Sequence, residues 1–294
     1  MRPFEYIAPR TVQDAVSALK DWGERARVLS GGTDILIQMR TRRRTVDALV
    51  DVKGLAEANA VAFDPRDGLT LGAAVPCYRI YADKTIVERF TGIIDAASMI
   101  GGIQIQGRAS LGGNLSNAAP SADGVPPLIV QAAMAVIAGP GGTRQVAVED
   151  YCTGPGRTVL QPGEMLLSFR IPAPHSRSGA HYLRFIPRNE MDIAVAGTAA
   201  HVTLTPDGKS FLTARIALSA VAPTPLFVRE AGSSLVGEEV SEAAISRAAE
   251  IAQEAARPID DMRGTAEYRR HLVGVLTKRA LRGAVARARG EKPA

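Results

Sequence analysis

The apolar positions of the first 55 residues follow both helical and strand-like periods. Between residues 15 and 22 they recur at the spacing of an amphipathic helix, and Thr11 with Asp14 three residues later predicts its N-terminal cap. Gly23 predicts its end. This region is therefore predicted as α/β, with strands over 26–29 and 48–52 and a second helix over 34–40.

The middle of the chain mixes strand-like runs with one helical run and one irregular segment. Residues 101–127 are rich in Gly, Pro, Asn and Ser and lack periodicity, which predicts a long loop of the kind that is usually functional or disordered. Gly139-Pro140-Gly141-Gly142 predicts the turn of a hairpin. The other elements predicted here are strands over 69–75, 135–138, 143–148 and 165–171 and a helix over 88–99.

The last part of the chain orders its strands before its helices. Residues 172–179 (PAPHSRSG) are predicted to form a linker, and Asp207-Gly208 predicts a turn between two strands. Strands followed by helices indicate an α+β unit, and 294 residues are enough for two domains. The elements predicted here are strands over 181–185, 194–204 and 213–220 and helices over 241–256 and 268–289.

Composition excludes several classes of protein. No apolar run approaches the length of a transmembrane helix, and the N-terminus lacks the pattern of a signal peptide. The net charge of +5 is clumped in residues 40–44 and 278–292, and only 5% of residues are aromatic, which disfavours nucleic-acid binding. These basic segments are either solvated faces or contacts for an acidic partner. Two cysteines cannot ligate an iron–sulfur cluster, and no metal site is expected; we favour the reducing cytoplasm.

Two glycine pairs carry the candidate chemistry. Ser30-Gly31-Gly32-Thr33-Asp34 follows a predicted strand and precedes a predicted helix, so its backbone N–H groups are suited to a phosphate. Ser110-Leu111-Gly112-Gly113-Asn114 lies in the irregular segment and adds short polar side chains around a second pair. Taken alone, the first pair is more often a plain tight turn, and the second could be one too. The two together fit the two phosphates of a dinucleotide better. The GxGxxG and GxxxxGK[ST] motifs are absent, which disfavours a Rossmann fold and a P-loop.

At these residues the sequence resembles the FAD-binding medium subunit of molybdenum hydroxylases, the group of carbon monoxide dehydrogenase and xanthine dehydrogenase. The resemblance implies a two-part FAD-binding domain of the vanillyl-alcohol-oxidase-like (PCMH) type over 1–177, and a small sheet with a helical bundle over 178–294. The segments that carry it, beside the two glycine pairs, are Gln104-Ile105, Ala119 to Asp123, Gly163 to Leu166, Ile171-Pro172, Tyr182 to Ala194, Ala222 to Pro225 and Arg263 to Arg269.

The resemblance also implies roles for individual residues. The two glycine loops would hold the FAD pyrophosphate through backbone N–H groups. Asp123 would accept hydrogen bonds from the FAD, and Leu166 would lie against the flavin. Arg184 stands where many relatives carry a Lys near the isoalloxazine and would keep the positive charge there. Asp192 would orient this region, or is simply a polar residue at the end of a strand.

The sequence departs from the family pattern at two places that bear on FAD binding. Gln106-Gly107 replaces the usual Arg-Asn, which affects the conformation of that loop. Thr33 stands where covalent relatives carry a flavin-linking His, so noncovalent FAD is expected. No residue of this chain is expected to be a catalytic acid, base or metal ligand.

By the same resemblance, the chain passes electrons through FAD from a small [2Fe-2S] subunit to an external acceptor. A large subunit carries the molybdenum cofactor, and the assembly is (αβγ)2. Two other interpretations stay open: a stand-alone FAD-dependent oxidase or reductase, and a nonenzymatic subunit without cofactor. The sequence names neither the organic substrate nor the acceptor.

Overall fold

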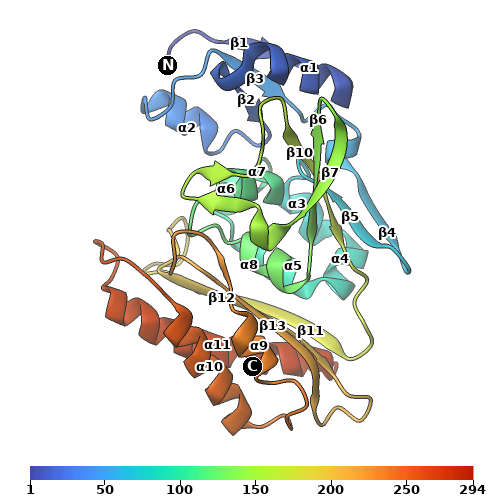
Figure 1. Ribbon diagram of the computed structural model, residues 1–294, viewed down its shortest axis with the longest axis vertical. Helices are drawn as coiled ribbons and strands as arrows, with labels where there is room; N and C mark the ends of the chain where they lie inside the picture. The colour runs from blue at the N-terminus through green and yellow to red at the C-terminus, as the bar shows by residue number, and fades with distance from the viewer. Residues whose placement is uncertain (294) are drawn as a thin grey trace.

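The computed structural model describes residues 1–293, which form three units stacked along the long axis of the molecule (Figure 1). The first unit is a three-stranded parallel sheet in the order β1-β3-β2. The predicted cap of its first helix is confirmed, because the Asp14 backbone N–H donates to Thr11 Oγ1 at 3.1 Å. The elements of this unit are β1 (Glu5–Ile7), α1 (Val12–Trp22), η1 (Gly23–Arg25), β2 (Ala26–Leu29), α2 (Ile35–Arg40) and β3 (Ala48–Asp51).

The second unit is a five-stranded antiparallel sheet in the order β4-β5-β10-β6-β7, joined by short helices. The predicted hairpin is confirmed, because Gly139 pairs with Gly142 across a two-residue turn. The elements are η2 (Glu57–Asn59), β4 (Val61–Asp64), β5 (Gly68–Gly72), α3 (Cys77–Ala82), α4 (Lys84–Arg89), α5 (Thr91–Met99), α6 (Ile103–Gln106), α7 (Leu111–Ser116), α8 (Val125–Val130), β6 (Met134–Gly139), β7 (Gly142–Ala147), η3 (Val148–Asp150), β8 (Cys152–Gly154), β9 (Arg157–Thr158) and β10 (Met165–Ile171).

The helices of the second unit correct two sequence predictions. The predicted loop 101–127 contains α6 and α7 and the start of α8, so it is not one irregular segment. Ser110 caps α7, and prolines occupy the first turn of α8, where a missing N–H costs nothing. The predicted helix 88–99 is divided at Phe90, which is buried in the core between α4 and α5.

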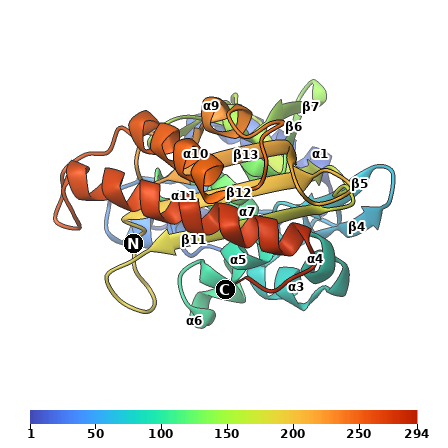
Figure 2. The same ribbon diagram turned by 90° about the horizontal axis from the view of Figure 1, so that it is seen from below.

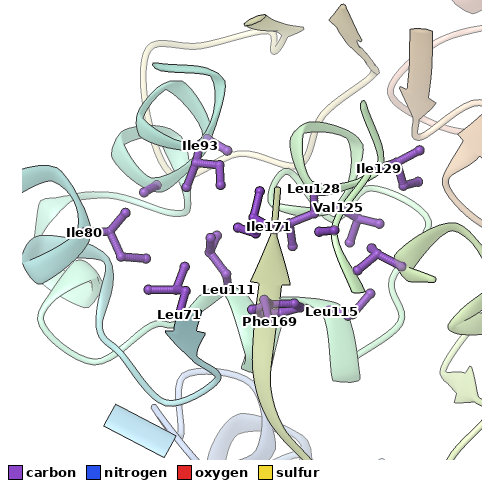
Figure 3. Packing of buried hydrophobic residues seen from close by; sticks show 14 of the residues in the cluster. Leu71, Ile80, Ile93, Leu111, Leu115, Val125, Leu128, Ile129, Phe169 and Ile171 are labelled. Atoms are coloured by element: carbon purple, nitrogen blue, oxygen red, sulfur yellow. The ribbon is translucent and has the colours of Figure 1, made fainter. Parts of the chain in front are cut away.

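The core of the second unit lies between its sheet and these short helices. Figure 3 shows Phe169 and Ile171 of β10 facing Leu111 and Leu115 of α7 and Leu128 of α8. All five side chains are almost completely buried. The apolar residues of the glycine-rich segment therefore hold it against β10, although their spacing shows no helical period.

The third unit is a four-stranded antiparallel sheet in the order β11-β12-β13-β14, with α10 and α11 on one face (Figure 2). The three predicted strands and two predicted helices are confirmed, whereas β14 and α9 were not predicted. The predicted linker ends within β11, which already begins at Ser178. The elements are β11 (Ser178–Phe185), β12 (Ala196–Leu204), β13 (Phe211–Ser219), β14 (Leu226–Phe227), α9 (Arg229–Ser233), α10 (Glu242–Ala255) and α11 (Ala266–Ala288).

Salt bridges between carboxylates of the second unit and arginines of the third join these two units. Within the described part of the chain, each of these bridges has its carboxylate before residue 178 and its arginine after it. This arrangement fixes the orientation of the third unit on the second by charge as well as by packing. The pairs are Asp95 with Arg287, Asp123 with Arg184, and Glu149 with both Arg215 and Arg229.

His201 gives the fold a pH dependence that can be measured. It lies on β12, where its pKa is lowered to about 4. Burial is the largest cause, and the positive charges of Arg215 and His175 add to it. The unfolded chain has a His pKa near 6.5, so protons favour unfolding, and stability falls as the pH drops from 6.5 to 4. The expected contribution is about 3 kcal/mol at pH 4. Urea unfolding at pH 7 and pH 4.5 should show a smaller difference for H201Q than for the wild type.

The matched control for this prediction is H271Q, because His271 is exposed on α11. H271Q should keep the pH dependence of the wild type. Equal pH dependence in H201Q and H271Q would contradict the assignment.

Candidate functional site

The two predicted glycine loops line one cavity of about 640 Å³. A cavity of this size lies within the range that holds cofactors. The first loop joins β2 to α2, and the second leads into α7. The predicted site residues that line it are Ser30, Gly31, Gly32, Thr33, Asp34, Ser110, Gly112, Gly113, Asn114 and Leu166.

The two loops touch each other directly. Ser30 Oγ lies 3.0 Å from Ser110 Oγ, although 80 positions separate them in the sequence. A Cβ on Gly31 would lie 2.7 Å from the Arg108 carbonyl carbon and closer still to its oxygen. Only glycine permits this approach of two backbones, and this is the physical reason for the first pair.

The first loop presents a row of free backbone donors. Across residues 1–293, the backbone N–H groups of Gly31, Gly32, Thr33 and Asp34 donate no hydrogen bond to a protein atom. Gly32 has φ +82°, a left-handed conformation that turns successive N–H groups toward one side. Such a row of N–H groups is an anion-binding arrangement, and its contact with a pyrophosphate stays a prediction.

The polar side chains of the second loop hold backbone in place. Ser110 Oγ accepts from the Gly113 N–H at 3.1 Å and so caps α7. Asn114 Oδ1 accepts from the Gly124 N–H at 2.9 Å, which ties α7 to the loop before α8. These side chains form part of the cavity wall. One acceptor of each is already used in a hydrogen bond within the protein.

The apolar part of the cavity wall includes Leu166, Leu160 and Ile100. Leu166 lies on β10 at a register shift between this residue and Ser168, and it is 6% exposed. An apolar wall opposite a row of polar donors suits a ligand with a ring system and a charged linker. The contact between Leu166 and the flavin stays a prediction.

Asp34 lies at the polar end of the loop, and burial of its carboxyl raises its pKa. Its side chain makes no capping bond to α2. An anion bound at the neighbouring N–H groups would raise this pKa further.

Three predicted site residues lie outside the lining of this cavity: Leu111, Asp123 and Arg184. Leu111 is 2% exposed and lies among Leu71, Phe169 and Ile171 in the core (Figure 3). Its side chain therefore holds the second loop against the sheet, and only its backbone remains available for the predicted role.

Asp123 and Arg184 are bonded to each other. Asp123 Oδ2 accepts from Arg184 Nη1 at 2.5 Å, and Oδ1 accepts from the Tyr182 hydroxyl at 2.6 Å. Burial raises the pKa of Asp123, and the charge of Arg184 opposes this shift. Both carboxylate oxygens thus have protein partners, so the predicted hydrogen bonds from FAD to Asp123 would have to share them.

Arg184 lines a second cavity, of about 610 Å³, between the end of α5 and the segment 185–190. Its side chain is 6% exposed and forms a salt bridge with Asp123. The structure thus places Arg184 in a cavity separate from the glycine loops. Its predicted position beside the isoalloxazine stays a prediction.

Gln106, which departs from the family pattern, is buried and holds its own loop. Its Nε2 donates to the Ser98 carbonyl at 2.8 Å and to the Ile100 carbonyl at 3.4 Å. Gly107, the other departure, has no atom within 4 Å of the place where a Cβ would lie. The loop before Ser110 is therefore fixed without the Arg-Asn of the relatives.

Several basic residues around the cavity were not predicted from the sequence. Lys53 and Arg108 donate to carbonyls of the first loop. Arg27, Arg44 and Arg157 line the cavity itself. Lys53 comes directly after β3, and β3 pairs in parallel with β2, so the two strands end side by side. This order of predicted strands was the one signal in the sequence that Lys53 lies beside the first glycine loop.

Comparison with known proteins identifies the family. Residues 2–174 match "FAD binding domain in molybdopterin dehydrogenase", and residues 181–284 match "CO dehydrogenase flavoprotein C-terminal domain". The chain is 35% identical to the carbon monoxide dehydrogenase medium chain of Afipia carboxidovorans, over 97% of this chain and 98% of that one. It is 31% identical to the xanthine dehydrogenase FAD-binding subunit of Escherichia coli, over 97% of each chain.

Solved structures agree with this result. The carbon monoxide dehydrogenase of Hydrogenophaga pseudoflava superposes with a TM-score of 0.93 at 30% identity, over 97% of this chain and 98% of that one. Quinoline 2-oxidoreductase of Pseudomonas putida 86 superposes with a TM-score of 0.89 at 27% identity, over 98% of each chain.

The two sheets with their helices, followed by the C-terminal sheet and helices, have the fold of a two-part FAD-binding domain joined to a CO dehydrogenase flavoprotein C-terminal domain. The chain belongs to the FAD-binding medium subunits of molybdenum hydroxylases. It is an oxidoreductase subunit, and its cofactor is FAD. None of the helices within residues 1–293 is long and apolar enough to cross a membrane.

Proposed function

We propose that this chain is the FAD-carrying subunit of a molybdenum hydroxylase. Through its FAD it passes electrons from a [2Fe-2S] subunit to an external electron acceptor. The observation that carries the proposal is the row of unpaired N–H groups from Gly31 to Asp34, in a cavity closed by a second glycine loop. Such a row supplies hydrogen bonds to a pyrophosphate without any added cation. FAD stores one or two electrons, so it can collect single electrons from an iron–sulfur cluster and deliver them to an acceptor.

The residues of this chain bind and orient the cofactor in this account. The N–H groups of the two loops would hold the pyrophosphate, and Leu166 would exclude water from one face of the ring system. Arg184 would supply positive charge near the flavin, at a position fixed by its bond to Asp123. No proton transfer by a side chain of this protein is required.

We further propose that FAD is bound noncovalently. Thr33 lacks a nucleophilic ring nitrogen of the kind that a covalent His link uses. The cavity lining, as far as residues 1–293 contribute to it, also contains no His, Cys or Tyr. A side chain suited to a flavin bond is thus missing from the cavity wall.

The proposed partners are a large subunit with the molybdenum cofactor and a small subunit with two [2Fe-2S] clusters, as (αβγ)2 in the cytoplasm. Relatives named as medium chains and FAD-binding subunits support a multi-subunit complex. The organic substrate would be bound by the large subunit.

Affinity purification of the tagged chain from its native cells tests this function. We expect two further chains, with one molybdenum and about four iron atoms per FAD, since two [2Fe-2S] clusters hold four. The native mass of the complex checks the (αβγ)2 stoichiometry. A chain that purifies alone and oxidises or reduces a substrate without partners would instead favour a stand-alone flavoenzyme.

A further inference from the structure

Two cations hold two consecutive carbonyl groups of the first glycine loop. Lys53 Nζ donates to the Ser30 carbonyl at 3.1 Å, and Arg108 Nε donates to the Gly31 carbonyl at 3.1 Å. Neither cation comes from the loop itself. Lys53 follows β3, and Arg108 belongs to the segment that leads into the second glycine loop.

The geometry of the peptide bond gives these contacts a consequence. In a trans peptide, the C=O and the following N–H point in opposite directions, and residues 1–293 contain no cis peptide bond. The Gly31 N–H therefore points away from Lys53, and the Gly32 N–H points away from Arg108. These are the first two of the four unpaired donors in the cavity lining.

Lys53 is itself held by an ordered chain of contacts. Its Nζ lies 2.7 Å from Asp51 Oδ1, and Asp51 Oδ2 accepts from the Tyr6 hydroxyl at 2.5 Å. Burial alone would raise the pKa of Asp51, but the bonds from Lys53 and Tyr6 outweigh it and lower this pKa. Asp51 therefore stays charged at neutral pH and keeps the Lys53 amine directed at Ser30.

A hydrogen bond from a cation also polarises the peptide that accepts it. The N–H on the other side of the same peptide then becomes a stronger donor, because successive hydrogen bonds reinforce each other. Lys53 and Arg108 thus act twice on the loop, through orientation and through polarisation, without lying in the path of the ligand.

We infer that Lys53 and Arg108 are positioning residues that orient the Gly31 and Gly32 N–H groups toward the pyrophosphate of the bound dinucleotide. This inference rests on the proposed function. It adds two residues from outside the glycine motifs to the binding site, and both act through the backbone.

The test measures binding of FAD and of ADP to the full chain after its flavin has been removed. ADP carries the pyrophosphate without the flavin, so a defect in pyrophosphate binding should weaken both ligands by the same factor. We expect about a 10-fold loss for K53M and for R108M, the effect of one hydrogen bond to a charged group. K53R should keep most of the wild-type affinity, because arginine can still donate to the Ser30 carbonyl.

The matched controls are K84M and R66M, which remove exposed cations that do not line the cavity. Both should bind FAD like the wild type. Thermal unfolding of the ligand-free variants separates positioning from folding, and K53M should unfold within a few degrees of the wild type.

Three results would overturn the inference while the proposed function stands: unchanged FAD affinity in both K53M and R108M, equal losses in K53M and K53R, or a loss for FAD without one for ADP. A wild-type chain that binds no FAD would instead overturn the proposed function itself.

Discussion

G31A is expected to lose at least 100-fold in affinity for FAD. The added Cβ would lie 2.7 Å from the Arg108 carbonyl carbon and 3.1 Å from Ala109 Cα. Both are backbone atoms, so no side chain can rotate away, and the two glycine loops must separate. Overpacking of this kind costs about 1–3 kcal/mol, and the displaced N–H groups add to the loss of binding. Titration of the flavin-free chain with FAD, followed by flavin fluorescence, gives the affinity.

The control for this prediction is G107A, in the same segment of the chain. Gly107 has φ −67°, and no atom lies within 4 Å of a Cβ built there. G107A should bind FAD within about twofold of the wild type, as expected for an unstrained surface substitution. If G31A bound FAD as tightly as G107A does, the contact between the loops would be irrelevant to binding.

D123A is expected to destabilise the fold by about 3–5 kcal/mol, the usual cost of leaving a buried charge without its partner. The side chains of Asp123 and Arg184 are only 10% and 6% exposed, and their charged atoms lie 2.5 Å apart. The substitution also removes the acceptor of the Tyr182 hydroxyl. Urea unfolding of the flavin-free chain at pH 7 measures the loss.

Two comparisons sharpen this test. E238A breaks a salt bridge whose partners are 49% and 52% exposed, and it should cost less than about 1 kcal/mol. The double variant with D123L and R184M should recover part of the stability, since it leaves neither charge unpaired. A cost for D123A no larger than that for E238A would show that the pair does not hold the C-terminal unit in place.

Local signals in the sequence were sufficient for most of the fold. The cap of α1 at Thr11 and the turn between β6 and β7 depend on residues close together in the chain. The same holds for the order of strands and helices after residue 178. These features follow from backbone preferences, which the sequence displays directly.

The short helices of residues 101–127 could not be predicted in this way. α6 and α7 have four and six residues, too few for a hydrophobic period to appear. Packing against β10 stabilises α7, through Leu111 and Leu115 (Figure 3). Tertiary contacts therefore decided the structure of a segment whose composition indicates a loop.

The candidate site also has residues that local motifs in the sequence reveal and residues that only long-range contacts reveal. The two glycine pairs were found because close backbone approach requires glycine, and the sequence shows this requirement. Lys53 was missed because its contact with Ser30 spans 23 residues and exists only once β2 and β3 pair. The bond between Arg184 and Asp123 spans 61 residues, and no local pattern marks it.

The visible absorption spectrum of the purified chain, before and after release by acid or heat, tests the central claim most directly. We expect flavin bands in the native protein that move entirely into the supernatant when the protein precipitates. Flavin retained in the precipitate would contradict noncovalent binding. A colourless protein that takes up no added FAD would contradict the assignment of the two glycine loops as its binding site.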